Sequence, residues 1–582
     1  MTRLDHAIVG GLVALLAVIT VAIGAPALAP GAAGLASPFP NPSLLEIVAY
    51  REGSLGRPVS VNPLAARTQV DRDLVALAFS GLVRLGPDGS VVPDLATRWS
   101  SDASGKTWTF ELRPNARWHD GEPVTANDVV FTVRTLRDPA YQGPGAGSWN
   151  EATATAIGDR TVRFDLATPI GGFLQLATQP IAPAHLLDGV PIEALATDPF
   201  GRTPVGSGPY AITELDDGHA VLEPASTVAQ PAIDAASPDP GSGALPTDTI
   251  ATPRPTKRPG SPTPAIGRIE LRFFDNPAAL AAAFRAGDLD AASGLPAADA
   301  KALATSANAR TLRYPGTTLT AIILNLRPRH PELRDPQVRR ALLAAIDRPA
   351  IISSAFGGLA VAADSPIPPT SWAFDAAASP TVAHSAKAAA TALTKAGWKK
   401  TAGKWRPAGA TAPYTIELLS PSEATNPAVA AIANAVAANW QSIGLTTKVV
   451  QEDAGSPLID VLTAGTFTAA AVDVSIGHDP DLYPLLASSQ TQTGGLNVIG
   501  LQDASLDKLL VAARQPGTME TRKPAFTALE TSLSAGTFVL PIAFADEVVV
   551  VRSNLQQVVV QPVGDPSDRF YDVLTWRLAN DR

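Results

Sequence analysis

The sequence predicts an α/β protein with more than one lobe. The chain has 582 residues, well beyond the size of one ordinary domain. Runs with period-two alternation recur between segments whose apolar residues fall at helical spacing. Strands that alternate with helices in this way are typical of sheets covered by helices. Hydrophobic residues make up 46% of the chain and charged residues 17%, so a sizeable core can form.

The clearest local pattern is a strand followed by a turn and a helix. Trp108, Phe110 and Leu112 alternate with polar residues, which predicts a half-buried strand. Asp120-Gly121 then marks a turn. Thr125 is placed to cap a helix that continues through the apolar residues after it.

The other elements follow the same two periodicities along the chain. We expect Gly206 and Gly208 to permit positive φ and a tight chain reversal before the strand at 210–214. Further strands are expected at 46–50, 161–166, 268–274, from 288, at 323–326, 416–419 and 445–451. Further helices are expected at 71–85, near 171, at 278–286, 334–348 and 427–443.

Residues 1–36 are expected to be a signal or membrane-anchor segment and a tether. Arg3 precedes an uninterrupted apolar run from 7 to 23, and Ala25-Pro26-Ala27 offers a cleavage pattern. The run is also near the length of a spanning helix, about 20 residues. A cleaved signal and a retained anchor both stay open. Either one places the rest of the chain outside the cytoplasm, in the periplasm or at the cell surface.

Composition excludes several classes of function. The net charge of −9 argues against nucleic acid as a partner, because a nucleic-acid-binding protein presents a basic face. Cysteine is absent, which excludes disulfides, thiol catalysis and a lipid-modified N-terminal cysteine. The seven histidines show no metal-ligand spacing, and no nucleophile-elbow or P-loop motif occurs. We therefore expect no enzyme, no metal and no cofactor.

Residues 228–264 differ from the rest of the chain. They are rich in Pro, Ala, Ser, Thr and Gly and poor in large apolar residues. Such a stretch cannot bury enough surface to offset its ordering entropy, so we expect a mobile surface insertion. The alternative is a basic docking site built on Arg254, Lys257 and Arg258.

A series of motifs resembles one known family. The chain reads Trp-Thr-Phe-x-Leu-Arg-Pro from 108, then Trp-His-Asp-Gly-Glu-Pro-Val-Thr-Ala-Asn-Asp from 118. Pro-Val-Gly-Ser-Gly-Pro-Tyr follows at 204, and Phe-Arg-x-Gly-Asp-Leu-Asp at 284. This order resembles the extracytoplasmic solute-binding proteins of the peptide/nickel class, family 5, which deliver ligands to ABC importers. The resemblance covers about 46–577, except the insertion.

The resemblance implies a two-lobe, type II periplasmic-binding-protein-like fold with an extra α/β domain on the N-terminal lobe. Lobes of this kind close over a ligand by hinge motion. The implied domains are lobe I at 44–72, 203–318 and 552–582, with the insertion 228–264, the extra domain at 73–202, and lobe II at 319–551.

The implied function is the substrate-binding component of an ABC importer, which captures a peptide-like or other small solute. The implied partners are that ligand and the permease subunits in the membrane, and the chain is expected to be a monomer. A surface-anchored ligand sensor or interaction protein on the same scaffold is the alternative. Peptides, oligosaccharides and metal chelates all stay open as ligands.

Candidate ligand residues come from the same resemblance. Peptide-binding relatives hold the ligand's amino terminus with an aspartate in a segment like 472–483, where alignment puts Ile476 at the aspartate's position. Asp473 or Asp479 replaces it only if the loop is re-routed. The alternative is that Asp479 and Asp481 are loop and helix-cap residues. Large aromatics in loops that face the cleft in relatives either stack on a ligand or belong to the core. The candidates are Tyr141, Trp149, Trp372, Asp473, Ser475 and Asp479.

Overall fold

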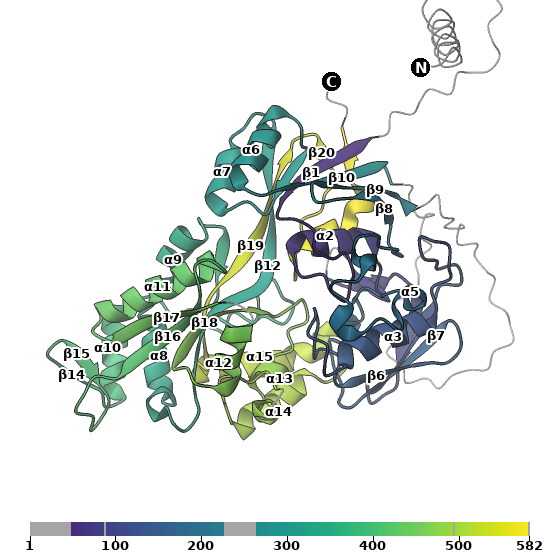
Figure 1. Ribbon diagram of the computed structural model, residues 1–582. Helices are drawn as coiled ribbons and strands as arrows, with labels where there is room; N and C mark the ends of the chain where they lie inside the picture. The colour runs from purple at the N-terminus through teal and green to yellow at the C-terminus, as the bar shows by residue number, and fades with distance from the viewer. Residues whose placement is uncertain (1–47, 87–88, 226–263, 454–455, 493–494, 580–582) are drawn as a thin grey trace, which may run out of the picture. The chain divides into compact units, whose positions relative to one another are not determined.

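The computed structural model describes residues 48–86, 89–225, 264–453, 456–492 and 495–579 (Figure 1). The elements below all belong to one structural unit, residues 48–582. The expected signal or anchor at 1–36 lies outside the described residues, as does nearly all of the insertion 228–264. Within the described part of the chain, no helix combines the length and apolar character needed to cross a membrane.

A mixed sheet of 11 strands runs through the centre of the fold (Figure 1). The strand order is β17-β16-β18-β12-β19-β11-β1-β10-β9-β8, and β13 pairs with β19 outside this path. In that order the strands are Thr446–Glu452, Thr415–Pro421, Ala469–Ser475, Ala309–Leu324, Val539–Arg552, Ala291–Ser293, Ala49–Leu55, Arg268–Phe274, His219–Pro224 and Tyr210–Leu215; β13 is Ala360–Ala362.

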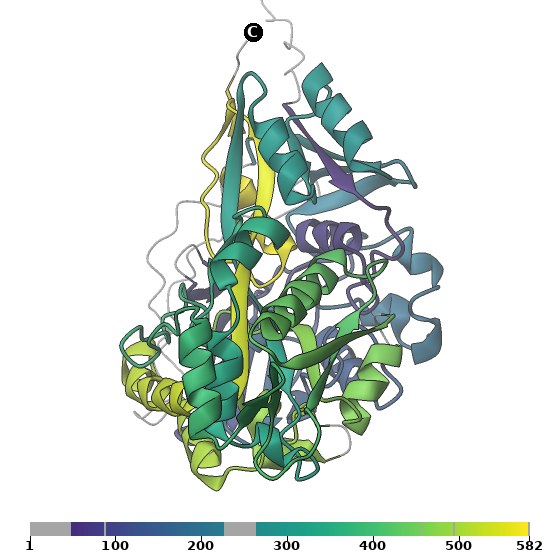
Figure 2. The same ribbon diagram turned by 90° about the vertical axis from the view of Figure 1, so that its left-hand side faces the viewer.

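Two long antiparallel strands in the middle of this sheet, β12 and β19, are called the crossing strands (Figure 2). Their pairing runs from Ala309 opposite Arg552 to Pro315 opposite Asp546, and resumes with a shift at Leu319 opposite Phe544. Before the shift, Leu312 and Tyr314 pack in a large hydrophobic core, while Val548 and Val550 pack in a smaller one. Residues after the shift pack in a second large core. The crossing strands therefore connect two separately packed bodies, which is the arrangement a two-lobe protein needs.

The first core gathers β1, α2, a four-stranded sheet and a C-terminal 3₁₀ helix, and the second gathers helices around the other end of the crossing strands. The four-stranded sheet has the order β4-β5-β7-β6, with bounds Ala96–Ser101, Thr107–Leu112, Thr161–Leu166 and Ala152–Ala156. The helices of the first core are α2 Gln69–Ala78, α3 Ala126–Arg137, α4 Phe173–Leu176, α5 Ala184–Leu187 and η6 Pro566–Thr575. Those around the second core are α8 Pro336–Ala344, α9 Arg348–Ala355, α10 Ala386–Lys395, α11 Pro427–Ser442, α12 Ser456–Ala464, α13 Tyr483–Leu486, α14 Ala504–Ala513 and α15 Met519–Gly536. Two further helices are α6 Pro277–Ala286 and α7 Ala297–Ala304. Three two-stranded sheets pair β2 Val83–Leu85 with β3 Val91–Pro93, β14 Lys399–Thr401 with β15 Lys404–Arg406, and β20 Leu555–Gln556 with β21 Arg577–Leu578. Short 3₁₀ helices are η1 Ile192–Ala194, η2 Pro199–Gly201, η4 Pro331–Leu333 and η5 Ser488–Thr491.

Several helix ends confirm the expected start and stop signals. Thr125 and Asp128 form a capping box at the start of α3, as predicted for Thr125. Asp335 caps α8 by accepting a hydrogen bond from the backbone N–H of Gln337. The helix α6 ends at Gly287, whose φ of 89° is the left-handed conformation that glycine adopts without strain.

Three expected helices have different bounds. The helix predicted for 71–85 is wrong beyond Ala78, because the chain turns extended at Phe79 and continues into β2. The helix predicted for 334–348 ends at Ala344, and Asp347 caps a second helix, α9, that continues to Ala355. The helix expected near 171 is the single turn of α4.

The reason for glycine at Gly206 and Gly208 also differs from the expectation. Neither of these two glycines has a positive φ. Instead both backbones press against the end of α2: a Cβ at Gly206 would overlap the carbonyl oxygen of Ala78, and one at Gly208 would lie 2.6 Å from its carbonyl carbon. The N–H of Gly208 donates to that same oxygen at 2.8 Å. Close approach of two backbones, not a left-handed turn, requires these glycines.

Candidate ligand site at the crossing strands

Asp473 lies at the end of β18, beside the crossing strand β12. Its carboxylate accepts a hydrogen bond from the Thr320 hydroxyl at 2.6 Å and one from the Asn426 amide at 3.3 Å. Burial of the carboxylate raises the pKa of Asp473, although the residue keeps exposed surface. The sheet and the start of α11 thus hold one acidic side chain beside the crossing strand β12.

Ser475 and Ile476 continue the same strand. Ser475 is exposed and lies opposite Thr318 on β12. Residues two apart in a strand face the same side, so Ser475 and Asp473 share one face. Ile476 is buried in the second core, and its N–H donates to the carbonyl of Thr317 at 3.2 Å.

Asp479 is paired inside the protein rather than open to solvent. Both of its carboxylate oxygens accept hydrogen bonds from Arg522, one of them at 2.8 Å, and both side chains are almost fully buried. Arg522 also lies over the ring of Trp372, 5.0 Å from its centroid. Two candidates, Asp479 and Trp372, are therefore brought together by an arginine that sequence reasoning missed, since nothing marks it within the helix α15. Gly172 covers the pair from the first core, with its Cβ position 3.3 Å from Asp479.

Tyr141 and Trp149 lie in the first core, away from those residues. The Tyr141 hydroxyl donates to the carbonyl oxygens of Leu64 and Pro144, both at 2.8 Å, and burial raises its pKa. Trp149 is 2% exposed and packs on Phe164, with centroids 5.8 Å apart. Ligand contact by the six candidates stays a prediction.

A second polar bridge joins the two cores at Arg514. Its guanidinium binds the carboxylate of Asp481 at 2.9 Å and lies 3.6 Å from that of Glu151. The guanidinium also donates to the Thr168 hydroxyl at 3.5 Å. The guanidinium also stacks on Tyr483, 4.5 Å from the ring centroid. Asp481 is thus a structural partner of Arg514, and its carboxylate also accepts a hydrogen bond from the N–H of Tyr483, as a loop residue does.

The face of the crossing strands toward α2 and η6 carries a buried charge cluster. Arg569 on η6 binds Asp73 on α2 and Glu52 on β1, at 2.7 to 2.8 Å. Glu547 lies on β19, half-buried, opposite Tyr314 on β12. Burial raises the pKa of Glu547 to about 7, and the neighbouring carboxylates add to the effect of burial. Sequence reasoning missed this cluster because its members are scattered along the chain.

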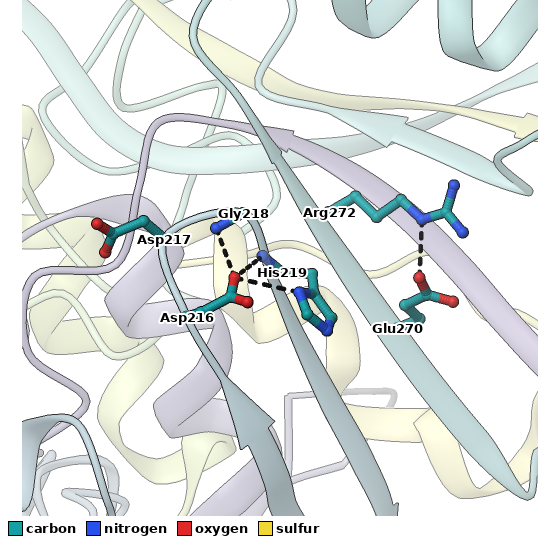
Figure 3. A pocket seen from close by; sticks show the side chains of 6 residues that line it. All are labelled: Asp216, Asp217, Gly218, His219, Glu270 and Arg272. Carbon is teal, nitrogen blue, oxygen red and sulfur yellow. Dashed lines mark hydrogen bonds and ion pairs between the residues drawn. The ribbon is translucent and has the colours of Figure 1, made fainter. Parts of the chain in front are cut away.

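A hollow on the described surface lies elsewhere (Figure 3). It measures about 730 Å³ and lies at the turn between β8 and β9 and along β10. Its carboxylates already have partners: Asp216 accepts from the N–H groups of Gly218 and His219, and Glu270 pairs with Arg272 at 2.8 Å. We therefore do not assign the ligand to this hollow. Among the described residues, no group of three or more His, Cys, Asp or Glu is arranged to hold a metal ion.

Comparison with known proteins identifies the family. Residues 90–495 match the bacterial extracellular solute-binding proteins, family 5. The oligopeptide-binding protein AppA of Bacillus subtilis is 24% identical over 536 residues, which cover 90% of this chain and 91% of AppA. The di/tripeptide-binding protein 3 of Pseudomonas aeruginosa is 24% identical over 563 residues, covering 93% and 96% of the two chains. The structure of AppA in complex with a nonapeptide superimposes with a TM-score of 0.68 at 23% identity, covering 91% of this chain and 99% of AppA.

The two-lobe architecture and this match define an extracytoplasmic binding protein. The chain belongs to the bacterial extracellular solute-binding proteins of family 5. It is the substrate-binding component of an ABC importer, as the first of the two functions drawn from the sequence requires. The expected fold class, two lobes of α/β structure, is confirmed.

Proposed function

We propose that this chain binds peptides between its two lobes, beside the crossing strands, and delivers them to permease subunits in the membrane. The observation that carries the proposal is the pair of relatives matched over 91% and 96% of their own lengths, which are named for oligopeptides and for di- and tripeptides. A match over nearly the whole length supports a shared mode of capture rather than one shared domain. The chain acts as a monomer that hands over one solute at a time.

Asp473 is the residue proposed to hold the amino terminus of the peptide. A carboxylate suits an ammonium group, and its present hydrogen-bond donors are a hydroxyl and an amide, which leave its charge uncompensated. Ser475 adds a hydroxyl on the same face. We give less weight to the other predicted ligand residues, because their side chains already contact other residues of the protein. They are Tyr141, Trp149, Trp372 and Asp479.

The same proposal divides the chain into the domains drawn from the sequence. Lobe I comprises 44–72, 203–318 and 552–582, the extra domain 73–202, and lobe II 319–551. The shift in register between Pro315 and Leu319 supports a hinge near the proposed boundary at 318–319.

A thermal-shift screen on the full chain, stripped of bound solute, tests this function. Peptides, oligosaccharides and metal chelates are compared at saturating concentration. A solute at a hundredfold excess over its Kd stabilises the folded state by about 2.7 kcal/mol. We expect peptides to raise the Tm, Asp473→Asn to remove that rise, and Glu417→Gln, at an exposed site on β16, to preserve it. A rise with sugars or chelates alone, or a peptide effect that survives Asp473→Asn, would contradict the proposal.

A further inference from the structure

Glu547 lies one residue pair before the point where the crossing strands change register. It follows Asp546, the last β19 residue paired before the shift, and it lies directly opposite Tyr314. Directly opposed residues on neighbouring strands point to the same face of the sheet. Tyr314 packs in the same hydrophobic core as α2 and η6, and Glu547 is half-buried.

The charges around Glu547 are mostly negative. From the elements packed against it, Glu52 on β1, Asp73 on α2 and Asp565 before η6 all act on its carboxyl group. Arg569 acts in the opposite direction and lowers the pKa of Glu547, but by less than burial raises it. Asp565 is paired with Arg72 at 2.7 Å, so that guanidinium is also engaged.

The terminal nitrogens of Arg569 already donate to other acceptors. Its two terminal nitrogens donate to Asp73, Glu52 and the carbonyl of Pro566. Among the described residues, Glu547 has no hydrogen bond or ion pair at all. On the same face, the fully buried Tyr314 hydroxyl and Arg569 Nε also lack a partner within the described part of the chain. A half-buried carboxylate without a donor is costly to ionise, and a cation with N–H donors removes that cost.

We infer that Glu547 receives a second positive group of the solute, a side-chain ammonium or guanidinium, so that the transported peptides are cationic. This inference rests on the proposed function and names its substrate class. Asp473 takes the amino terminus that every peptide has, whereas Glu547 distinguishes peptides by their side chains. A neutral or acidic side chain would leave the carboxylate unpaired or repelled.

Titration calorimetry with two tetrapeptides tests the inference. The peptides differ only in one lysine replaced by glutamine, and the full chain is stripped of solute beforehand. At pH 8 we expect the lysine peptide to bind about tenfold tighter to the wild type, which corresponds to about 1.4 kcal/mol. Glu547→Gln should abolish this preference while it binds the glutamine peptide as the wild type does. Glu270→Gln, the same change in the hollow of Figure 3, should retain the preference.

A second measurement needs no variant. Because the pKa of Glu547 is about 7, the wild type's preference for lysine should grow as pH rises from 6 to 8. Equal binding of both peptides, or a preference that survives Glu547→Gln, would overturn the inference and leave the proposed function standing. Binding of neither peptide to the wild type would overturn the proposed function, and the inference with it.

Discussion

Arg569 in the C-terminal segment binds both carboxylate oxygens of Asp73, which lies 496 residues earlier in the chain. The distances are 2.8 and 2.7 Å, and both side chains are at most 2% exposed. The same guanidinium reaches Glu52 on β1 at 2.8 Å. A buried bidentate contact therefore holds η6 against α2 and β1, on the side of the crossing strands that carries Tyr314.

Replacing Arg569 by Met should destabilise the protein by about 3–5 kcal/mol, because two carboxylates would remain buried without their cation. Urea denaturation of the solute-free chain measures the loss. Arg57→Ala is the control, since Arg57 makes an exposed ion pair with Asp275 and its loss should leave the midpoint almost unchanged. Combining Arg569→Met with Asp73→Asn and Glu52→Gln should recover part of the stability. A midpoint for Arg569→Met close to that of the control would refute this account of the cluster.

Replacing Asp479 by Asn should lower the solute-free stability by about 3 kcal/mol, because Arg522 would remain buried without a countercharge. Thermal melts without ligand measure this effect. Asp473→Asn is the matched comparison: its partners are a neutral hydroxyl and an amide, so its solute-free Tm should hardly change. If Asp479→Asn instead keeps the solute-free Tm and loses only the ligand-induced rise, Asp479 acts on the solute and not on the fold.

Replacing Gly206 by Ala should cost about 1–3 kcal/mol, because the new methyl group would overlap the carbonyl oxygen of Ala78 at the end of α2. The backbone on both sides of this contact is hydrogen-bonded and cannot withdraw easily. Gly218→Ala is the control, with its nearest atom 3.4 Å from the Cβ position. Equal denaturation midpoints for the two variants would show that close packing is not what requires glycine here.

Stability should fall as pH rises from about 4.5 to 7, with Glu547 as one cause. Its folded-state pKa of about 7 exceeds the ordinary value of 4.5, so the unfolded chain releases its proton first. Ionisation of Glu547 therefore lowers the free energy of unfolding above this pH range but not below it. The loss is about 3 kcal/mol at pH 8. Asp572, whose pKa burial raises to about 6, acts in the same direction. Denaturation midpoints of Glu547→Gln should decline less with pH than those of the wild type and of Glu270→Gln; parallel declines would contradict this assignment.

Local elements could be predicted from the sequence because their causes are local. Thr125 and Gly287 show this, since a cap and a left-handed residue are set by a few neighbours. The helix predicted to 85 failed because contacts of Leu82 and Val83 with the carbonyl of Ala177 override the apolar spacing. Propensity and periodicity do not contain such distant contacts.

The site could be predicted only as far as the resemblance reached. Nothing in the sequence distinguishes the role of Asp473 from that of Asp479. In the structure, Asp473 has neutral hydrogen-bond partners, whereas Asp479 is paired with Arg522. Glu547 sits in an apolar run that reads as an ordinary strand. Its significance arises from Asp73 and Arg569, which only the folded chain brings near. Charge clusters assembled from distant segments leave no spacing signal.

Calorimetric titration of the full, solute-free chain with peptides tests the central claim most directly. The claim is that this protein captures a peptide beside the crossing strands through carboxylates on β18 and β19. It predicts saturable one-to-one binding with a negative change in heat capacity, as lobes bury apolar surface around the solute. It also predicts that Asp473→Asn weakens binding of every peptide. No measurable binding of any peptide, or affinities that Asp473→Asn leaves unchanged, would contradict it.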